Sequence, residues 1–354
     1  MKKHIISSKF LNRAIVFAFL SALLFGISTP INKVFLNDFE PITLAGLLYL
    51  GSAVFLSPIV FKEKDNFKIV LKSKRKNGLY LFGAIVFGGI LGPVFLLFGL
   101  KNTLAGSAAL LLNFETVSTA IIAFIFFKEH IHKKTWIGNL GVFISGIILS
   151  FEGSWEGFVG SIFILLAGVF WGLDNNFTAK IDELSPVTST FSKGIVAGIV
   201  NLTLGMIFEE FRVSLITIIY ILIIGAFSYG LSIILYIRSA QELGATRSQM
   251  IFASGPFWGL MFSLILLNEN LYPQQIIVGF ILILSLYLMF SDTHDHEHQH
   301  IYLYHSHPHD HTDIHHQHDH ENHSFNDPET LWHVHKPTKH SHPHYPDLHH
   351  RHEH

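Results

Sequence analysis

The histidines near the C-terminal end have the most evident chemistry in this chain. Between Asp292 and His354, 22 of the 25 histidines fall within 63 residues, in runs such as HDHEHQH and HHQHDH. Neutral imidazole, with a free pKa of about 6.5, is a ligand for Ni, Zn, Co and Cu. We therefore expect the segment to bind divalent transition metal. The first twelve of these histidines are the predicted ligands: His294, His296, His298, His300, His305, His307, His309, His311, His315, His316, His318 and His320.

The same segment, residues 292–354, is predicted to be a disordered tail. Acids, prolines and histidines dominate it, and apolar residues are few. Such a composition cannot bury a core, so we expect no fixed structure without bound metal. The interleaved acids and prolines are unlike a purification tag. The pattern does not say which metal binds, and we expect no required cofactor.

Two carboxylates lie inside apolar segments, Glu115 in LNFETV and Asp174 in GLDNNF. Ionisable groups are costly within a bilayer and usually face a cavity or a partner. Both are therefore predicted to bind a substrate. The alternative is a buried, hydrogen-bonded side chain that serves only packing.

Five further polar residues join this candidate substrate site. Asn175 follows the second carboxylate, and Thr178 shares its helix face at four-residue spacing. Ser28 and Asn32 have the same spacing, although such residues also hold helices together. Lys193 either faces the interior or extends its ammonium to the membrane surface.

Ten apolar segments must position these residues. Hydrophobic residues make up 49% of the chain and charged residues 14%. A membrane-crossing helix needs about 17 to 25 residues, and the continuous apolar runs favour helices over barrel strands. We predict an all-α membrane protein with ten transmembrane helices. The segments are 14–35, 42–61, 79–100, 107–127, 136–151, 158–176, 187–208, 215–236, 248–267 and 276–290.

Lysine and arginine occur in alternate loops, which predicts the orientation. The N-terminal residues 1–13 and the loops 62–78 and 128–134 are basic, whereas 37–40 and 151–157 carry acids. Basic loops remain in the cytoplasm. We expect a multi-pass protein of the cell membrane, with both termini and the tail cytoplasmic.

The segments divide into two similar halves, residues 14–151 and 158–290. SALLFGISTPINK in the first half resembles AGVFWGLDNNFTAK in the second, and Glu129 and Glu269 close the fourth segment of each. We interpret both glutamates as helix caps or loop ion pairs. Since five is odd, the halves insert in opposite senses. Inverted repeats of this kind are typical of alternating-access carriers.

These motifs, together with LLLNFETVSTAIIAFIFFKE and IFASGPFWGLMFSLILLNE, resemble EamA-type carriers of the drug/metabolite transporter superfamily. The resemblance covers about residues 12–291. It implies a ten-helix bundle that moves small metabolites, often outward. Thr116 stands where the family usually has proline, while Pro256 keeps it in the second half. The first half is therefore expected to lack a kink.

Two functions remain open. The first is a secondary transporter, acting in efflux, whose tail senses, buffers or delivers metal that is itself carried. The second is an organic-metabolite exporter whose tail only stores metal or regulates. No nucleophile and base pair, phosphate loop or protease motif is found, and there is no cysteine, so an enzyme is not expected. The expected partners are the lipid bilayer, a small-molecule or metal substrate and a second copy in a homodimer, without nucleic acid.

Overall fold

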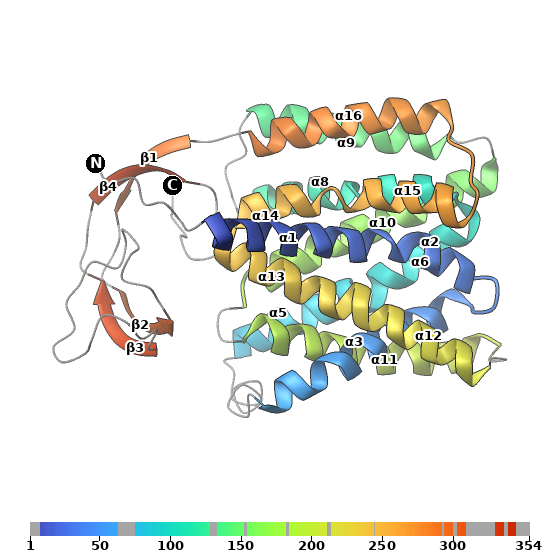
Figure 1. Cartoon of the computed structure of the whole chain (residues 1–354), viewed down its shortest axis with the longest axis horizontal. Coiled ribbons are helices and arrows are strands. Elements are labelled where there is room, and N and C mark those ends of the chain that lie inside the picture. The colour runs from blue at the N-terminus through green and yellow to red at the C-terminus, as the bar shows by residue number, and fades with distance from the viewer. Residues whose placement is uncertain are drawn as a thin grey trace. The chain divides into compact units, whose positions relative to one another are not determined.

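The computed structural model describes most of the membrane segments and four short stretches of the tail. It covers residues 8–62, 75–127, 133–151, 154–181, 184–210, 214–243, 245–291, 294–299, 303–308, 330–335 and 339–344. The chain divides into two units, Met1–Asp292 and Thr293–His354. The first unit is a bundle of helices (Figure 1).

The helices of the bundle follow the two halves of the sequence. The first half contains α1 (Ser8–Gly26), α2 (Ser28–Phe35), α3 (Pro41–Lys62), α5 (Arg75–Ala84), η1 (Ile85–Leu91), α6 (Gly92–Asn102), α7 (Ala105–Leu111), α8 (Phe114–Phe127) and α9 (Lys133–Ser150). The second half contains α10 (Trp155–Thr178), α11 (Pro186–Phe208), α12 (Leu215–Gly225), η2 (Ala226–Leu231), α13 (Ser232–Leu243), α14 (Ala245–Phe252), α15 (Gly255–Leu266) and α16 (Pro273–Phe290).

Nine helical stretches among the described residues are long and apolar enough to cross a membrane. They match nine of the ten predicted spans. The remaining span is α9, an 18-residue helix that begins with Lys133 and Lys134 and contains Asn139. These polar residues lower its average apolarity. The chain is thus a multi-pass membrane protein, and its unit Met1–Asp292 is all-helical in the described residues.

The fourth helix of each half is broken at the same position, between α7 and α8 and between α14 and α15. The expectation that the first half lacks a kink was therefore wrong. Thr116 Oγ1 donates to the carbonyl of Asn113 at 2.7 Å, and the Asn113 side-chain amide donates to the carbonyl of Leu110 at 3.4 Å. Such local bonds compete with the helix ladder. These bonds occur at the break in the first half, whereas Pro256 stands just after the break in the second half.

The third helix of each half contains a π-helical turn, η1 in the first and η2 in the second. A π-turn leaves the ordinary backbone ladder locally and is frequent at functional sites. In η1, the carbonyl of Gly88 accepts hydrogen bonds from Tyr49 Oη at 2.7 Å and Trp171 Nε1 at 3.1 Å. In η2, the carbonyl of Tyr229 accepts from Ser52 Oγ at 3.0 Å.

The helix contacts have the pattern of two interchanged repeats. α3 packs along α11 and α9 packs along α16, so the second and fifth helices of each half meet their counterparts. α1 packs against α13 and α15, and α10 correspondingly packs against α6 and α8. The first and sixth helices meet each other at Phe25 and Trp171, whose ring centroids are 6.4 Å apart. Each first helix therefore packs mainly against the opposite half.

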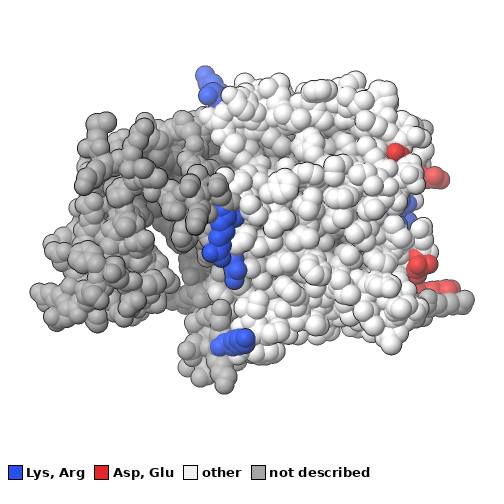
Figure 2. Space-filling model, viewed as in Figure 1, with Lys and Arg blue, Asp and Glu red and all other residues white. Residues whose placement is uncertain are grey.

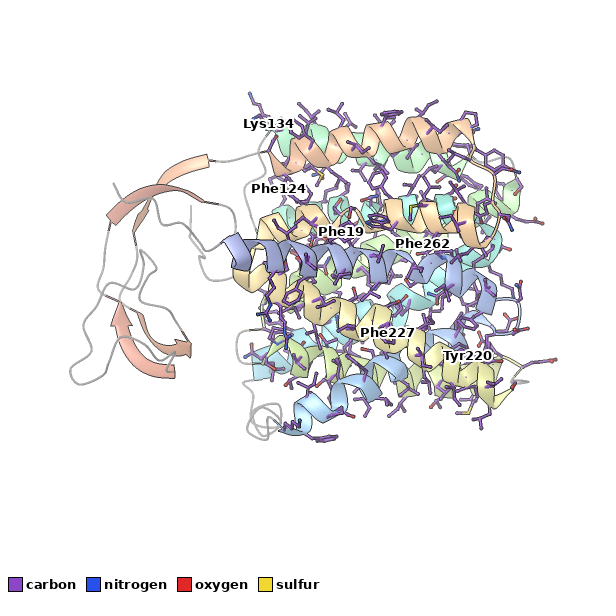
Figure 3. The ribbon with its side chains drawn as sticks, in the orientation of Figure 1. Phe19, Phe124, Lys134, Tyr220, Phe227 and Phe262 are labelled. Atoms are coloured by element: carbon purple, nitrogen blue, oxygen red, sulfur yellow. The ribbon has the colours of Figure 1, made fainter. Side chains whose placement is uncertain are left out.

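The outside of the bundle is apolar and its ends are charged. Figure 3 shows Phe19, Phe227 and Tyr220 along this outer surface, and all three are exposed. On the face shown in Figure 2, Asp and Glu gather at one end of the bundle and most Lys and Arg at the other. An apolar surface of this extent suits lipid contact.

The described parts of the tail contain four strands: β1 (His294–Gln299), β2 (Leu303–Pro308), β3 (Thr330–His335) and β4 (Lys339–His344). β1 pairs with β4 and β2 with β3, both antiparallel. The prediction of a wholly disordered tail is therefore wrong for these four segments. Residues that alternate in type suit the two-residue period of a strand, and backbone pairing needs no apolar core.

Candidate functional site

Asp174 and Lys193 form an ion pair in the interior of the bundle. Lys193 Nζ lies 2.6 Å from both Oδ1 and Oδ2 of Asp174, and Thr178 Oγ1 donates to Oδ1 at 3.0 Å. The side chains of the pair are only 11% and 16% exposed, the aspartate having the lower value. The sequence left open whether Lys193 faces the interior or extends to the membrane surface. In the structure it faces the interior.

A glycine makes room for this pair. Gly88 in η1 lies against α10, and a Cβ atom at this position would overlap the carboxylate of Asp174. The neighbouring Gly89 likewise lies against Lys193 and Ala197 of α11. The π-turn thus brings bare backbone up to both partners, because larger residues would not fit there.

Glu115 and Asn175 form a second polar contact beside the ion pair. Glu115 stands in the first turn of α8, and its Oε1 accepts from Asn175 Nδ2 at 2.7 Å. The same amide reaches Thr119 Oγ1 at 3.2 Å. Glu115 also interacts electrostatically with Asp174 and Lys193. Five of the predicted residues, from α8, α10 and α11, therefore form one cluster, which we call the acidic cluster: Glu115, Asp174, Asn175, Thr178 and Lys193.

Ser28 and Asn32 of α2 are buried and bond other residues than the acidic cluster. Ser28 Oγ donates to the carbonyl of Phe25 at 2.6 Å, and Asn32 Nδ2 approaches Tyr229 Oη at 3.5 Å. The Oδ1 atom of Asn32 is buried without a hydrogen-bond partner among the described residues. The structure does not join these two side chains to the carboxylates by any direct bond it describes.

Aromatic side chains pack together beside Asn32 and Gly88. Tyr49 of α3 and Tyr229 of η2 have ring centroids 5.5 Å apart, and Phe25 contacts both Tyr229 and Trp171. Neither Tyr49 nor Trp171 was among the residues predicted from the sequence. For Trp171, the available signal was its position in FWGLDNNF, three residues before Asp174 on the same helix.

Two glutamates cap helices across the repeats. Glu269 accepts from the backbone N–H groups of Ala105 and Gly106 at 2.7 and 3.0 Å, at the start of α7. This contact agrees with the interpretation of Glu269 as a cap. Glu209 does the same for α3, accepting from the N–H groups of Ile42 and Thr43 at 2.8 Å. Glu129 lies outside the described residues.

The cavities described for the bundle are elsewhere. One of about 210 Å³ lies between α8, α9 and α10 and has an apolar lining that includes Phe114 and Phe143. Another of about 200 Å³ is bordered by Asp38, Glu40 and Glu210. Neither lining includes a member of the acidic cluster.

The predicted metal ligands are described only in part. His294, His296 and His298 lie in β1, and His305 and His307 lie in β2. The other seven, His300, His309, His311, His315, His316, His318 and His320, lie outside the described residues. Within the described part of the chain, no group of three His, Asp or Glu residues is placed to hold a metal ion.

Comparison with known proteins gives relatives over nearly the whole membrane unit. An uncharacterized transporter of Methanothermobacter thermautotrophicus is 25% identical over 292 residues, covering 76% of this chain and 84% of its own length. One of Archaeoglobus fulgidus is 22% identical over 280 residues, covering 76% and 83%. The uncharacterized transporter YyaM of Bacillus subtilis is 27% identical over 242 residues, covering 64% and 77%.

A solved structure and a family model also match this chain. A solved crystal structure superposes with a TM-score of 0.58 at 11% identity, covering 78% of this chain and 94% of that one. The model of the EamA-like transporter family matches twice, at residues 12–151 and 158–291. That family consists of transporters, not enzymes. The chain belongs to the EamA-like transporter family.

Proposed function

We propose that the protein is a secondary carrier that exports a small polar solute by alternating access, and that the acidic cluster binds this solute. The observation that carries the proposal is the buried Asp174–Lys193 pair with the Glu115–Asn175 contact beside it. Charges inside a bilayer are expensive, and they usually mark a substrate or ion pathway. Export, rather than uptake, rests on the family resemblance.

The cluster suits a solute that carries charge. It offers two carboxylates, one ammonium, an amide and hydroxyl groups on three helices. In the structure these groups bond one another. A bound solute would therefore replace some of these bonds with bonds to its own charged groups. Separating a buried ion pair is costly when neither charge finds a new partner. The cluster therefore favours a solute whose own charges can pair with Asp174 or Lys193.

An organic solute is better supported than a bare metal ion. The cluster contains an ammonium bonded to one of its two carboxylates, and an ammonium repels a cation. Among the described helices no histidine accompanies the carboxylates, so the softer transition metals would lack the imidazole ligands they prefer. Metal as the transported species remains the second candidate.

Transport into proteoliposomes tests this proposal. A panel of organic cations, anions, zwitterions and divalent metals is offered to the purified wild type and to Glu115→Gln. The matched control is Glu156→Gln, which removes the same charge from an exposed position on α10. We expect one organic class to be transported, with a large loss in Glu115→Gln and none in the control. Equal rates in all three proteins would remove the cluster from the pathway.

We further propose that the tail binds divalent transition metal on the cytoplasmic side and does not belong to the pathway. Support comes from the histidine content and from the basic loops predicted to be cytoplasmic. Truncation after Ser291 should abolish most metal binding and leave basal transport intact. A folded truncated protein that no longer transports would contradict the accessory role.

A further inference from the structure

Ser28 in the first half is the counterpart of Asp174 in the second. In the similar motifs SALLFGISTPINK and AGVFWGLDNNFTAK, each of these residues stands two positions after a glycine, Gly26 or Gly172. The structure gives the two glycines equivalent neighbours, because a Cβ atom at Gly26 would meet α15 and one at Gly172 would meet α8. Each glycine thus lies against the fourth helix of the opposite half.

The third helix of the opposite half adds a residue to each of these places. In η1, the bare backbone of Gly88 lies against the Asp174 carboxylate. In η2, the hydroxyl of Tyr229 interacts with both Ser28 and Asn32 of α2. We call Ser28, Asn32 and Tyr229 the neutral group. The same arrangement of helices therefore holds charges in one place and uncharged polar groups in the other.

One buried acceptor of the neutral group has no partner among the described residues. Asn32 is fully buried, and this acceptor is its Oδ1 atom. Its Nδ2 atom lies 3.5 Å from Tyr229 Oη, which is long for a hydrogen bond. Buried polar atoms without a partner are rare, because each costs the free energy of a lost hydrogen bond. A donor that arrives with a solute would satisfy this atom.

Tyr49 connects the neutral group with the acidic cluster. Its ring centroid lies 5.5 Å from that of Tyr229, and its hydroxyl donates to the carbonyl of Gly88 at 2.7 Å. It also interacts electrostatically with Asp174. The two polar groups are therefore joined through one buried side chain.

We propose that the neutral group is the uncharged part of the solute site, in which Asn32 Oδ1 accepts a hydrogen bond from a hydroxyl or amide N–H group of the solute. The inference rests on the proposed function, since the acidic cluster would bind the charged part of the same solute. It names the substrate class, which is an organic solute that carries both a charge and an uncharged hydrogen-bond donor.

Thiol labelling tests this proposal, because the chain contains no cysteine. Asn32→Cys and Asp174→Cys are reconstituted into proteoliposomes as full-length proteins. The matched control is Asn139→Cys, since Asn139 is also buried but lies on α9. Each variant is treated with hydroxyethyl, aminoethyl and sulfonatoethyl methanethiosulfonate, which are neutral, cationic and anionic. All rates are divided by the rate of the same reagent with a free thiol.

Asn32→Cys should react fastest with the hydroxyethyl reagent and faster than the control, because the bonds described for the neutral group are all to uncharged atoms. Asp174→Cys should prefer the anionic reagent, since it leaves the Lys193 ammonium without its partner. A rate at Asn32→Cys no higher than at Asn139→Cys, or a preference there for a charged reagent, would overturn the neutral part of the site. If Asp174→Cys still reacts, only this inference fails. If Asp174→Cys is unreactive, the proposed function fails.

A second pair of variants tests the Asn32 acceptor itself and does not depend on the folding of Asn32→Cys. In Tyr229→Cys, Asn32 remains to accept a bond from the hydroxyethyl reagent. Adding Asn32→Leu removes the acceptor at similar volume and should slow this reaction about two- to ten-fold, as the loss of one hydrogen bond does. Ethyl methanethiosulfonate, which lacks the hydroxyl, should react equally with both proteins. Equal rates of the hydroxyethyl reagent in both proteins would overturn the role of Asn32.

Discussion

At the scale of residues, the acidic cluster joins side chains of three helices that bond one another in the interior of the bundle. Glu115 and Asp174 stood out because carboxylates are rare in apolar segments. The structure adds that Asp174 bonds Lys193 and that Glu115 bonds Asn175. These contacts join different helices, so no spacing along the chain could have shown them. The role of Gly88 also depends on a neighbour that is distant in sequence.

From the ion pair we predict how the free energy of unfolding changes in a single and a double variant. Asp174→Asn leaves Lys193 charged without its partner in the interior, which should cost about 3 to 5 kcal/mol. Adding Lys193→Met removes the orphaned charge and keeps the volume similar, so most of the lost stability should return. Thermal unfolding in detergent measures both variants. A single variant as stable as the double one would mean that water already reaches the pair.

Gly88 predicts an effect on transport without a change of charge. Alanine at this position would displace the Asp174 carboxylate. Loss of one charge-assisted hydrogen bond, about 1.5 kcal/mol, corresponds to roughly ten-fold in affinity. We expect Gly88→Ala to raise the apparent KM of transport about ten-fold.

Gly279→Ala is the control for this substitution, because nothing lies within 4 Å of a Cβ atom there. It should transport as the wild type does. An unchanged KM in Gly88→Ala would argue that the carboxylate position is unimportant for the solute.

At the scale of elements, the spans were predictable and their interruptions were not. Long apolar runs report burial in lipid, and nine of them are long and apolar enough in the described structure. Side-chain bonds accompany the break between α7 and α8 and the π-turns η1 and η2, such as the one from Tyr49 to Gly88. Average hydropathy carries no information about such bonds.

The glutamate caps predict that the two halves stabilise each other. Glu269 and Glu209 belong to the second half, and the helix starts that they cap belong to the first. Glu269→Ala and Glu209→Ala should each cost about 1 to 2 kcal/mol, as loss of a good helix cap does. Glu→Gln at the same positions keeps an acceptor oxygen, so it should cost less. Equal unfolding temperatures in the alanine and glutamine variants would show that the caps contribute little.

At the scale of the whole molecule, the interchanged contacts have the pattern of two repeats, and the opposite insertion of the two halves stays a prediction. Figure 2 shows the acidic and most of the basic residues at opposite ends of the bundle, and which end is cytoplasmic stays a prediction. The strands of the tail were missed because composition predicts the absence of a core, not the absence of backbone pairing. The pairing of β1 with β4 joins two segments of similar composition, so composition alone does not predict which segments pair.

The orientation predicts which side reaches each loop. Since the chain has no cysteine, Trp155→Cys provides a unique label at the start of α10. A membrane-impermeant thiol reagent added to intact cells should modify it, because the acidic end is predicted to lie outside. Lys134→Cys, at the start of α9, should react only after the membrane is opened. Reversal of these two results would invert the topology.

The claim that the acidic cluster binds the solute is tested most directly by a folded carrier that lacks its charges. The variant combines Glu115→Gln, Asp174→Asn and Lys193→Met, which removes both carboxylates and leaves no orphaned ammonium. Once the panel has identified a transported solute, counterflow in proteoliposomes compares this variant with the wild type at equal protein content. We expect a folded, monodisperse protein with no counterflow above empty liposomes. Counterflow at the wild-type rate would contradict it.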